Sequence, residues 1–428
     1  MVAIKNFPFY VTLLSLFLPF IVSQFHIEMH RFLLVGVFFI YISRGLLKGR
    51  LLTNNKYINT SLVFFIILVI IDLILGRGLR IFSYSHTYLY IFIFCSIFII
   101  EEKNINAKML ISQSNIIFKV LIVCLVIEFL FLLTGNFNLL QMIYPETGMS
   151  IVEGFRSYHN RFASYFNLDI EGFNSLITGN QIANTIALLS MIWFAPFYIF
   201  KPMQNRYLWF VISFLLFLLS PTITGTGLFL FSIFIFFTFL KNSSINSFKK
   251  IIPILFSLII IGSFSYEFIF LPLIDNSFMS AWYIYGFIYP IQNYFNLDLF
   301  YLIMGHTSES FADNFYSNEI GIIRLAMKIG MPLIIVVAVS ILTTLFKSNL
   351  LFSKENISRL FFSKIFEEYK NYSFLAQTNI LIVIIWVGST FHYLTIFRLG
   401  AAQLIAFQFT VSVFSLYKSN QIINSAKK

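Results

Sequence analysis

The sequence predicts an all-helical membrane protein with about twelve transmembrane helices, and three observations lead to this fold class. Of its 428 residues, 58% are hydrophobic and only 11% are charged, whereas soluble domains carry about 25% charged residues. The mean hydropathy is +0.84. The apolar residues are gathered in blocks, and many of these approach the roughly 20 residues of helix that cross a hydrocarbon core.

The apolar blocks follow one another along the chain with polar connections between them. The first block, 7–25, is too long for the apolar core of a signal peptide and contains Pro19 in place of a small-residue cleavage site, so we expect it to be a retained first helix. We expect one membrane domain over residues 1–428. The expected helices span approximately 7–25, 32–47, 60–75, 84–100, 116–134, 176–200, 207–220, 226–240, 251–272, 319–346, 374–391 and 396–417.

The distribution of Lys and Arg predicts the orientation. With the N-terminus inside, 21 of the 29 Lys and Arg residues fall in cytoplasmic segments and eight in outer segments, which is the positive-inside pattern. Both termini are therefore predicted to be cytoplasmic. Two extracytoplasmic connections are long, 135–175 and 273–318, and neither is large enough for a core of its own. The longest cytoplasmic connection, 347–373, contains Glu367–Glu368 and is expected to hold a surface helix.

The outer basic residues differ in kind from the inner ones. Seven of the eight outer residues are Arg, whereas 17 of the 21 inner residues are Lys. Orientation alone does not need Arg, but binding phosphate oxygens in pairs does need a planar guanidinium group. The bias therefore predicts an anionic ligand on the outer side. The net charge of +11 does not indicate nucleic acid, because the charges lie between hydrophobic blocks.

Arg156 and Arg161 flank His159 in the first long outer connection. Two guanidinium groups this close in sequence are suited to hold one phosphate or pyrophosphate. The alternative is an ordinary solvated loop, and the residues themselves leave both interpretations open.

The second long outer connection and the start of the next helix carry a further polar cluster. Asp313, His306 and Glu319 compete as candidates for a catalytic base or for positioning an acceptor, and Arg324 is a third candidate for an anion site. Ionisable groups this near hydrocarbon are costly unless they pair or face water. Helix capping and interfacial anchoring are the alternative roles.

Arg398 falls in the short outer turn between the last two expected helices, where it can serve as a further arm of an anion site or as an interfacial anchor. Asp72, Glu128 and Glu267 lie in or near expected helices. They are candidates for lining a cavity, and a proton or cation relay built from them is the alternative to simple ion pairing.

Several classes of chemistry lack their motifs. The sequence contains no GxxxxGK[ST] phosphate loop, no HExxH, no Cys/His set with zinc spacing and no GxSxG elbow. These absences argue against an ATPase, a zinc protease and a serine hydrolase. We expect no metal and no cofactor. Cys95 and Cys124 fall in apolar runs and are expected to be small buried residues.

Two stretches carry a family resemblance. The segments RFASYFNLDIEGFNSLITGNQIANTIALL and GHTSESFADNFYSNEIGIIRLAMKIGMP, within this layout of helices and long outer loops, resemble the Wzy-type O-antigen and capsular-polysaccharide polymerases. The resemblance covers the whole chain in layout and these two stretches in motif. It implies a metal-independent, GT-C-like glycosyltransferase of the bacterial cytoplasmic (inner) membrane, with its active site facing the periplasm or the cell exterior.

The resemblance also implies partners and residue roles. The donor and acceptor are expected to be undecaprenyl-pyrophosphate-linked oligosaccharide repeat units, with membrane lipids around the protein. The outer-loop arginines of the family map to Arg156, Arg161 and Arg324. Whether a chain-length regulator binds is left open. An O-antigen ligase, a lipid-linked oligosaccharide flippase and an unrelated transporter are the competing interpretations. The related ligases carry a His-Asn pair where this sequence has Asp313-Asn314.

Overall fold

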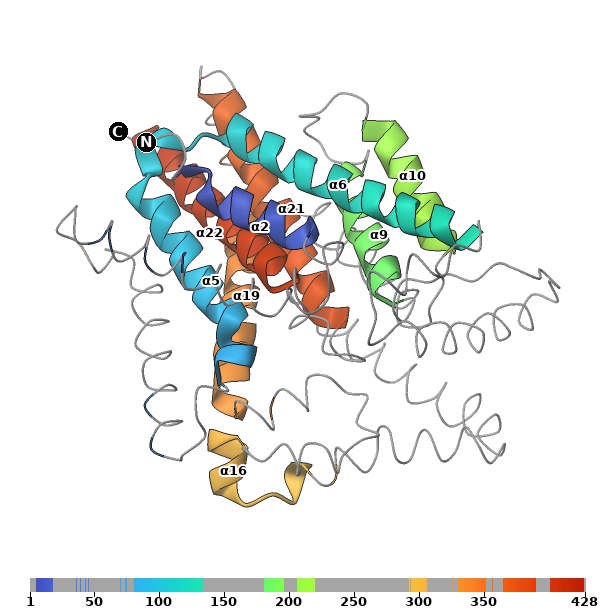
Figure 1. The fold of residues 1–428 in the computed structure, drawn as a ribbon. Helices are drawn as coiled ribbons and strands as arrows, with labels where there is room; N and C mark the ends of the chain where they lie inside the picture. Colours follow the sequence, from blue (N-terminus) through green and yellow to red (C-terminus); the bar gives the residue numbers. More distant parts are fainter. Residues whose placement is uncertain are drawn as a thin grey trace, which may run out of the picture.

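The computed structural model is helical wherever the chain is described (Figure 1). The described residues are 5–17, 81–133, 181–195, 206–219, 294–305, 330–351, 365–389 and 401–426, with the isolated positions 36, 39, 43, 45, 70, 74, 292, 326 and 356. The helices are α2 (Phe7–Phe17), α5 (Ile81–Ile100), the 3-10 helix η3 (Glu102–Asn104), α6 (Ala107–Leu133), α9 (Gln181–Phe194), α10 (Arg206–Leu219), α16 (Leu299–Met304), α19 (Met331–Leu350), α21 (Phe366–Ser389) and α22 (Ala401–Ser425).

Two of these helices, α6 over Ala107–Ile127 and α21 over Phe366–Gly388, are long and apolar enough to span a membrane. The all-helical prediction is thus confirmed for the described residues, while the number of spans and their orientation stay predictions. The predicted helices 32–47, 60–75, 226–240 and 251–272 lie outside the described residues, apart from isolated positions.

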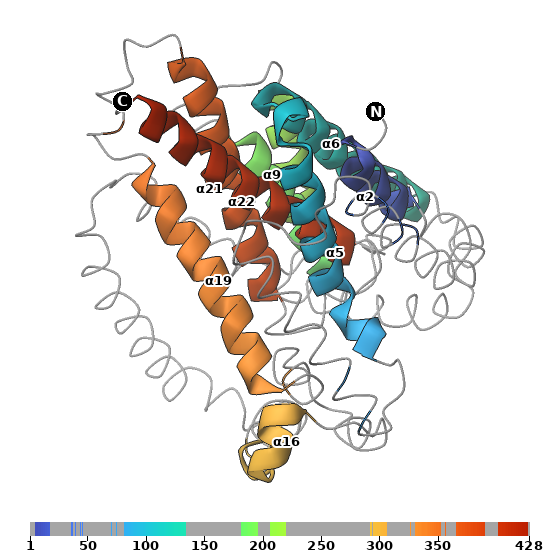
Figure 2. The same cartoon turned by 90° about the vertical axis from the view of Figure 1, so that its left-hand side faces the viewer.

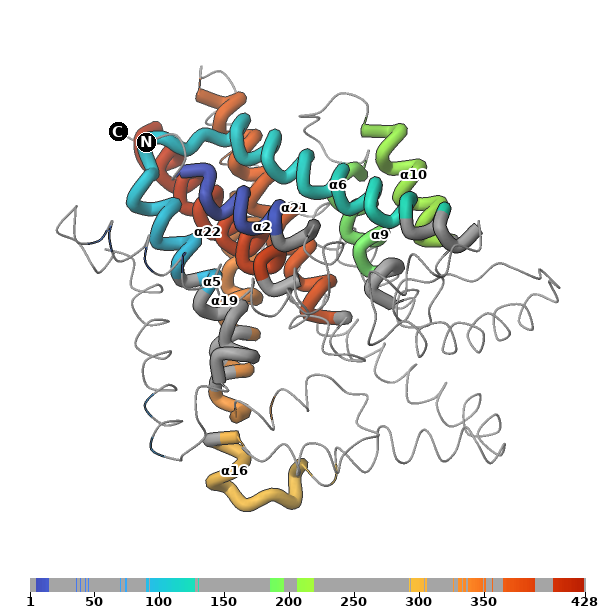
Figure 3. The backbone as a smooth tube through the Cα atoms, in the orientation of Figure 1, coloured from blue at the N-terminus to red at the C-terminus, as the bar shows by residue number. Residues whose placement is uncertain are grey.

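The helices α21 and α22 form the centre of the bundle. They pack against each other; α21 also contacts α6, α9 and α19, and α22 also contacts α2, α5 and α19. Figure 2 shows the pair between α19 on one side and α5 on the other. Helix α10 packs on α9 and α6 at the edge, and α6 runs obliquely across the upper side in Figure 1. The trace in Figure 3 brings the two chain ends to the same end of the bundle.

Three helices are longer than the apolar blocks predicted. Helix α6 begins at Ala107, not at 116, because the Asn106 side chain caps it: its Oδ1 accepts a 2.8 Å hydrogen bond from the Met109 N–H. Helix α21 begins at Phe366, not at 374, and α22 continues to Ser425, beyond 417. In each case hydropathy marks the apolar part of the helix, whereas backbone hydrogen bonding continues into the polar flank.

The acidic pair in the connection 347–373 has a different place from the one predicted. Glu367 and Glu368 form the first turn of α21 rather than a separate surface helix. Carboxylates stabilise a helix N-terminus through its macrodipole, and Glu367 pairs with Lys370 one turn later at 3.2 Å. The surface-helix prediction was therefore wrong for these two residues.

The predicted continuous helix 319–346 is also wrong, because the chain breaks at Gly330. Its φ is 81°, a left-handed conformation that only glycine adopts readily. Helix α19 starts immediately afterwards at Met331. Pro332 fits its first turn, where a missing N–H costs no hydrogen bond. A Cβ at position 330 would collide with the carbonyl oxygen of Ile303, so α16 and α19 meet at backbone distance there.

The described helices bury some polar side chains among apolar ones and expose large apolar ones, whereas polar residues cover most of the outside of a soluble domain. The central pair buries Gln377, Thr378 and Asn379 on α21 and Gln403 and Gln408 on α22. The edge helices expose large apolar side chains instead. These are Ile116, Val123, Ile127 and Leu130 on α6; Leu208, Val211, Phe214, Leu215 and Leu218 on α10; and Ile335, Val339, Leu342 and Leu350 on α19.

Candidate functional site

The candidate residues lie on three segments whose flanking helices the structure describes. The residues themselves fall outside the described part of the chain, as do Asp72, Glu267 and the side chain of Glu128. The seven candidates are Arg156, Arg161, His306, Asp313, Glu319, Arg324 and Arg398. What can be described is the framework that holds the ends of their segments.

The two ends of segment 306–329 are held at one point in the fold. Gly305 ends α16, and its N–H donates to the carbonyl of Tyr301 at 2.9 Å. The Cβ that Gly330 lacks would lie 3.3 Å from the Gly305 nitrogen. Both glycines have positive φ, 77° and 81°. The chain therefore leaves α16 and enters α19 at the same place, and the intervening segment carries His306, Asp313, Glu319 and Arg324.

A small buried cluster lies beside this junction. Tyr294 and Ala326 are buried, and Leu302 and Met331 pack against them. The Gly330 N–H donates to the Ala326 carbonyl at 2.9 Å, which ties segment 306–329 to the start of α19. Burial raises the pKa of the Tyr294 phenol above its ordinary value of 10.0, so the group stays neutral at physiological pH. Its hydroxyl has no hydrogen-bond partner among the described residues.

The segment with Arg156 and Arg161 connects α6, which ends at Leu133, to α9, which begins at Gln181. These two helices are fixed to each other near the opposite end. The Trp193 Nε1–H donates to the Oδ1 of Asn115 at 2.8 Å, and the Trp193 ring stacks on Phe118 with centroids 5.4 Å apart. A buried indole with its N–H satisfied makes this a rigid contact.

Arg398 falls between α21, which ends at Ser389, and α22, which begins at Ala401. Direct polar contacts hold this pair together. The Ser412 hydroxyl donates to the Ala376 carbonyl at 2.6 Å, and the hydroxyls of Ser373 and Ser419 lie 3.5 Å apart. The segment that carries Arg398 thus connects two helices that pack directly against each other.

A polar stripe on α22 escaped the sequence reasoning. Gln408, Ser412, Ser415 and Ser419 recur at spacings of four, three and four residues, so they share one helix face. All four are buried. Small and polar residues on such a face let two membrane helices approach closely and bond to each other. Helical spacing of polar residues within an apolar block is the signal that could have identified this stripe.

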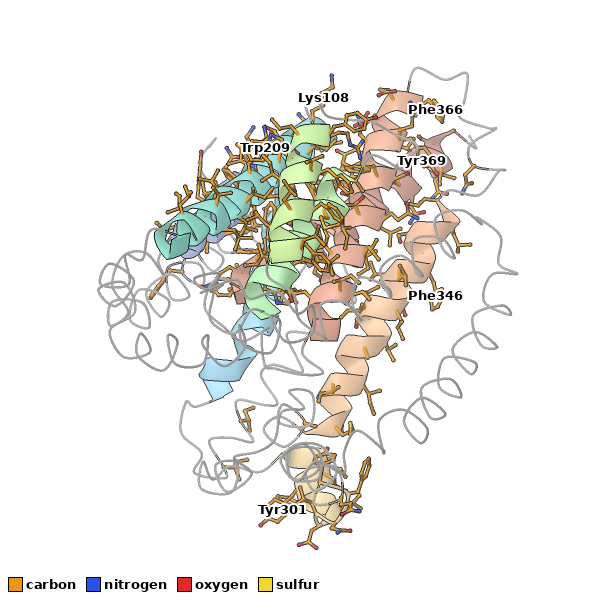
Figure 4. All side chains as sticks on the ribbon, turned by 90° about the vertical axis from the view of Figure 1, so that its right-hand side faces the viewer. Lys108, Trp209, Tyr301, Phe346, Phe366 and Tyr369 are labelled. Carbon is orange, nitrogen blue, oxygen red and sulfur yellow. The ribbon has the colours of Figure 1, made fainter. Side chains whose placement is uncertain are left out.

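Several described residues that border the predicted cytoplasmic segments lie at one end of the bundle. Lys418 on α22 pairs with Glu102 of η3 at 2.8 Å. The Gln113 side chain donates to the Oδ1 of Asn6 at 2.9 Å. In Figure 4, Lys108, Phe366 and Tyr369 lie at one end of the bundle, whereas Tyr301, from the second long connection, lies at the opposite end. The basic residues in the described part of the chain are Lys5, Lys103, Lys108, Lys119, Arg206, Lys347, Lys370 and Lys418, all from the set predicted to be cytoplasmic.

Of the two cysteines, Cys95 is buried, as expected, and its thiol lies 3.5 Å from the Thr410 hydroxyl. Cys124 is partly exposed, contrary to the expectation, because α6 lies at the edge of the bundle.

The described framework therefore brings the two ends of one candidate segment together, at α16 and α19. It also packs the helices that flank the other two segments against each other, α6 with α9 and α21 with α22. Compared with family models, curated proteins and solved structures, the chain matches none of them. The chemistry that the candidate residues themselves offer is phosphate binding by guanidinium groups and proton transfer by a carboxylate or an imidazole.

Proposed function

We propose that this chain is a polytopic bacterial membrane glycosyltransferase that polymerises undecaprenyl-pyrophosphate-linked oligosaccharide repeat units into O-antigen or capsular polysaccharide. It acts on the outer face of the cytoplasmic membrane, without metal, through about twelve helices with both termini inside. The observation that carries the proposal is the segregation of Lys and Arg. Of the eight basic residues predicted to lie outside, seven are Arg, and of the 21 predicted to lie inside, 17 are Lys. Guanidinium groups collected on one side suit a lipid-linked diphosphate.

The membrane location is supported by the distribution of polarity in the described helices. Exposed apolar faces on α6, α10 and α19 surround a central pair that buries amide and hydroxyl groups. Water would disfavour this arrangement, whereas lipid favours it because its hydrocarbon solvates the outer faces. The two helices long enough to span a membrane add to this support.

The chemistry requires charge stabilisation and one proton acceptor. An acceptor hydroxyl oxygen bonds to the anomeric carbon of the donor, while the bond from that carbon to the pyrophosphate oxygen breaks. Undecaprenyl pyrophosphate leaves with the bonding electrons, and Arg156, Arg161 and Arg324, with Arg398 as a further arm, stabilise its charge. The hydroxyl proton passes to Asp313, His306 or Glu319, a transfer that contributes roughly 10²–10⁴-fold to the rate.

Purified protein tests the reaction directly. Supplied with lipid-linked repeat units, it should give a ladder of longer lipid-linked glycans with no added nucleotide or metal. A deletion strain separates the alternatives. Loss of a polymerase leaves one repeat unit on the lipid core, loss of a ligase leaves long chains on the lipid carrier, and loss of a flippase leaves units inside the cell. Either of the last two outcomes contradicts the proposal.

The arginine pair should be sensitive to a change that keeps its charge. Arg156→Lys and Arg161→Lys each lose paired hydrogen bonds to phosphate, worth about 1.5–3 kcal/mol, so each should lower polymer yield by roughly tenfold or more. Arg359→Lys, in a predicted cytoplasmic segment, is the matched control and should be silent. Protein levels measured in the same membranes exclude a folding defect. Wild-type polymer from both outer variants would remove these arginines from the site.

The α16–α19 junction should be needed for polymerisation, because it closes the segment with His306, Asp313, Glu319 and Arg324. In Gly330→Ala the new Cβ meets the Ile303 carbonyl at a positive φ. We expect destabilisation by about 1–2 kcal/mol or more, seen as a lower thermal midpoint in detergent, and loss of polymer. Gly36→Ala is the control, because nothing lies within 4 Å of a Cβ at that position. A normal polymer yield from Gly330→Ala would show that the activity does not require this junction.

A further inference from the structure

A lysine on α6 rests against an aromatic ring of the neighbouring helix. The Lys119 Nζ lies 5.2 Å from the centroid of the Trp209 ring of α10. Lys119 is partly buried, and no carboxylate pairs with it within the described residues. The described carboxylates that form ion pairs at this end have other partners, since Glu102 pairs with Lys418 and Glu367 with Lys370. The positive charge at Lys119 is therefore not neutralised by the described part of the protein.

Lys119 stands at the edge of an exposed apolar stripe. Ile116, Val123, Ile127 and Leu130 share one face of α6, and all are at least 40% exposed. Lys119 follows Ile116 by three residues and precedes Val123 by four, which places it on nearly the same face. A cation beside exposed hydrocarbon side chains is the arrangement of a lysine that reaches toward a membrane surface.

The Trp209 ring is a fixed platform for this cation. It stacks on Phe194 at the end of α9 with centroids 6.1 Å apart. Arg206, one turn earlier on α10, is buried and donates from Nε to the Phe194 carbonyl at 3.4 Å. A second positive charge thus lies one turn from Trp209. Figure 4 shows Trp209 at the same end of the bundle as Lys108, Phe366 and Tyr369, the end that the basic residues predict to be cytoplasmic.

We propose that an anionic diacyl phospholipid of the cytoplasmic leaflet binds at α6–α10, with its headgroup phosphate on the Lys119 ammonium and its acyl chains along the α6 stripe. Charge complementarity selects the headgroup, since cytoplasmic-side lysines attract anionic lipids. Tryptophan and lysine at one level mark the membrane interface. The site rests on the membrane location given under Proposed function and is independent of the glycan chemistry.

Native mass spectrometry of the detergent-purified protein, titrated with phosphatidylglycerol or phosphatidylcholine, tests this site. The wild type should retain phosphatidylglycerol about fivefold more strongly than phosphatidylcholine, the order expected for one lysine at an anionic headgroup. Lys119→Gln should abolish the preference. Lys108→Gln is the matched control, because Lys108 is exposed on the same helix and loses the same charge; it should keep the preference.

A second measurement starts from the unaltered chain, so its first result does not depend on a variant that folds. In vesicles with a trace of brominated lipid, brominated phosphatidylglycerol should quench tryptophan fluorescence more than brominated phosphatidylcholine does. The difference should shrink in high salt, which screens charges, and should shrink in Trp209→Phe.

Three results overturn the site: equal binding of the two phospholipids, an unchanged preference in Lys119→Gln, or a stronger preference for a polyprenyl phosphate. Because no glycan is present, a failed polymerisation assay leaves the lipid result intact, and a failed lipid assay leaves the polymerase proposal intact.

Discussion

The central pair α21–α22 and the edge helix α10 differ in which side chains they bury and which they expose. Helix α22 buries Gln403, Gln408 and Ser412. Helix α10 is almost wholly apolar in sequence, yet leaves Leu208 59% and Leu215 52% exposed. In water, the exposed leucines would be unfavourable. The buried amides require hydrogen-bond partners in any apolar surroundings.

The contrast indicates what holds each region in place. In the membrane location proposed above, contacts with hydrocarbon around α10 replace contacts with protein, so the apolar face needs no covering helix. Between α21 and α22, hydrogen bonds such as Ser412 to Ala376 and close approach of small residues supply the specificity. Burial in this bundle therefore depends on helix-to-helix packing as well as on hydropathy.

The largest expected effect comes from placing a charge on the exposed face of α10. Leu215→Lys should cost about 2.5–3.5 kcal/mol if this face contacts lipid near mid-membrane, whereas a change on a water-exposed surface usually stays within about 0.5 kcal/mol. The amount of protein recovered in the membrane fraction measures it. Asn420→Lys, exposed near the end of α22, is the control and should be tolerated. Equal recovery of both variants would show that the exposed face of α10 does not contact lipid.

A smaller effect should follow from separating the central pair. In Ala376→Leu, the added methyl groups enter a fully buried position where the Ser412 hydroxyl meets the backbone. Overpacking of this kind costs about 1–3 kcal/mol, which thermal unfolding in detergent measures. Ala338→Leu makes the same change at an exposed site on α19 and should leave the unfolding midpoint nearly unaltered. Similar shifts for the two variants would mean that α21 and α22 are not closely packed.

The smallest effect concerns the end of the pair that the basic residues predict to be cytoplasmic. Lys418 and Glu102 lie 2.8 Å apart with side chains 19% and 26% exposed, so water still screens their attraction. A double-mutant cycle of Lys418→Met and Glu102→Gln should give a coupling free energy of about 0.5–1 kcal/mol. Additive effects of the two changes would show that this ion pair does not fasten α22 to η3.

Hydropathy predicted the positions of the described membrane-length helices, because their apolar centres are unambiguous. It could not predict their ends, which depend on local hydrogen bonds such as the Asn106 cap and on helix-terminus charges such as Glu367–Glu368. The break at Gly330 is a backbone conformation within an apolar block, so it leaves no trace in a hydropathy profile.

The central position of α21 and α22 in the bundle was not predicted from the sequence either. Hydropathy measures affinity for an apolar medium and does not distinguish lipid from protein. The helix face that packs on a neighbouring helix must therefore be recognised by its small and polar residues. On α22 these are Gln408, Ser412, Ser415 and Ser419. For the candidate site, the arginines remain predictions from charge and motif. The structure adds the anchoring of their segments, most clearly at Gly305 and Gly330.

The position of α22 has a consequence for biogenesis. This helix follows every other described helix in the chain, and it contacts α2, α5, α19 and α21. A nascent chain halted before Ala401 lacks the element on which these helices converge, and leaves groups such as Cys95, which lies beside Thr410, without their neighbours. The bundle therefore closes only after residues 401–425 have been synthesised, and until then the helices that pack on α22 lack part of their contact surface.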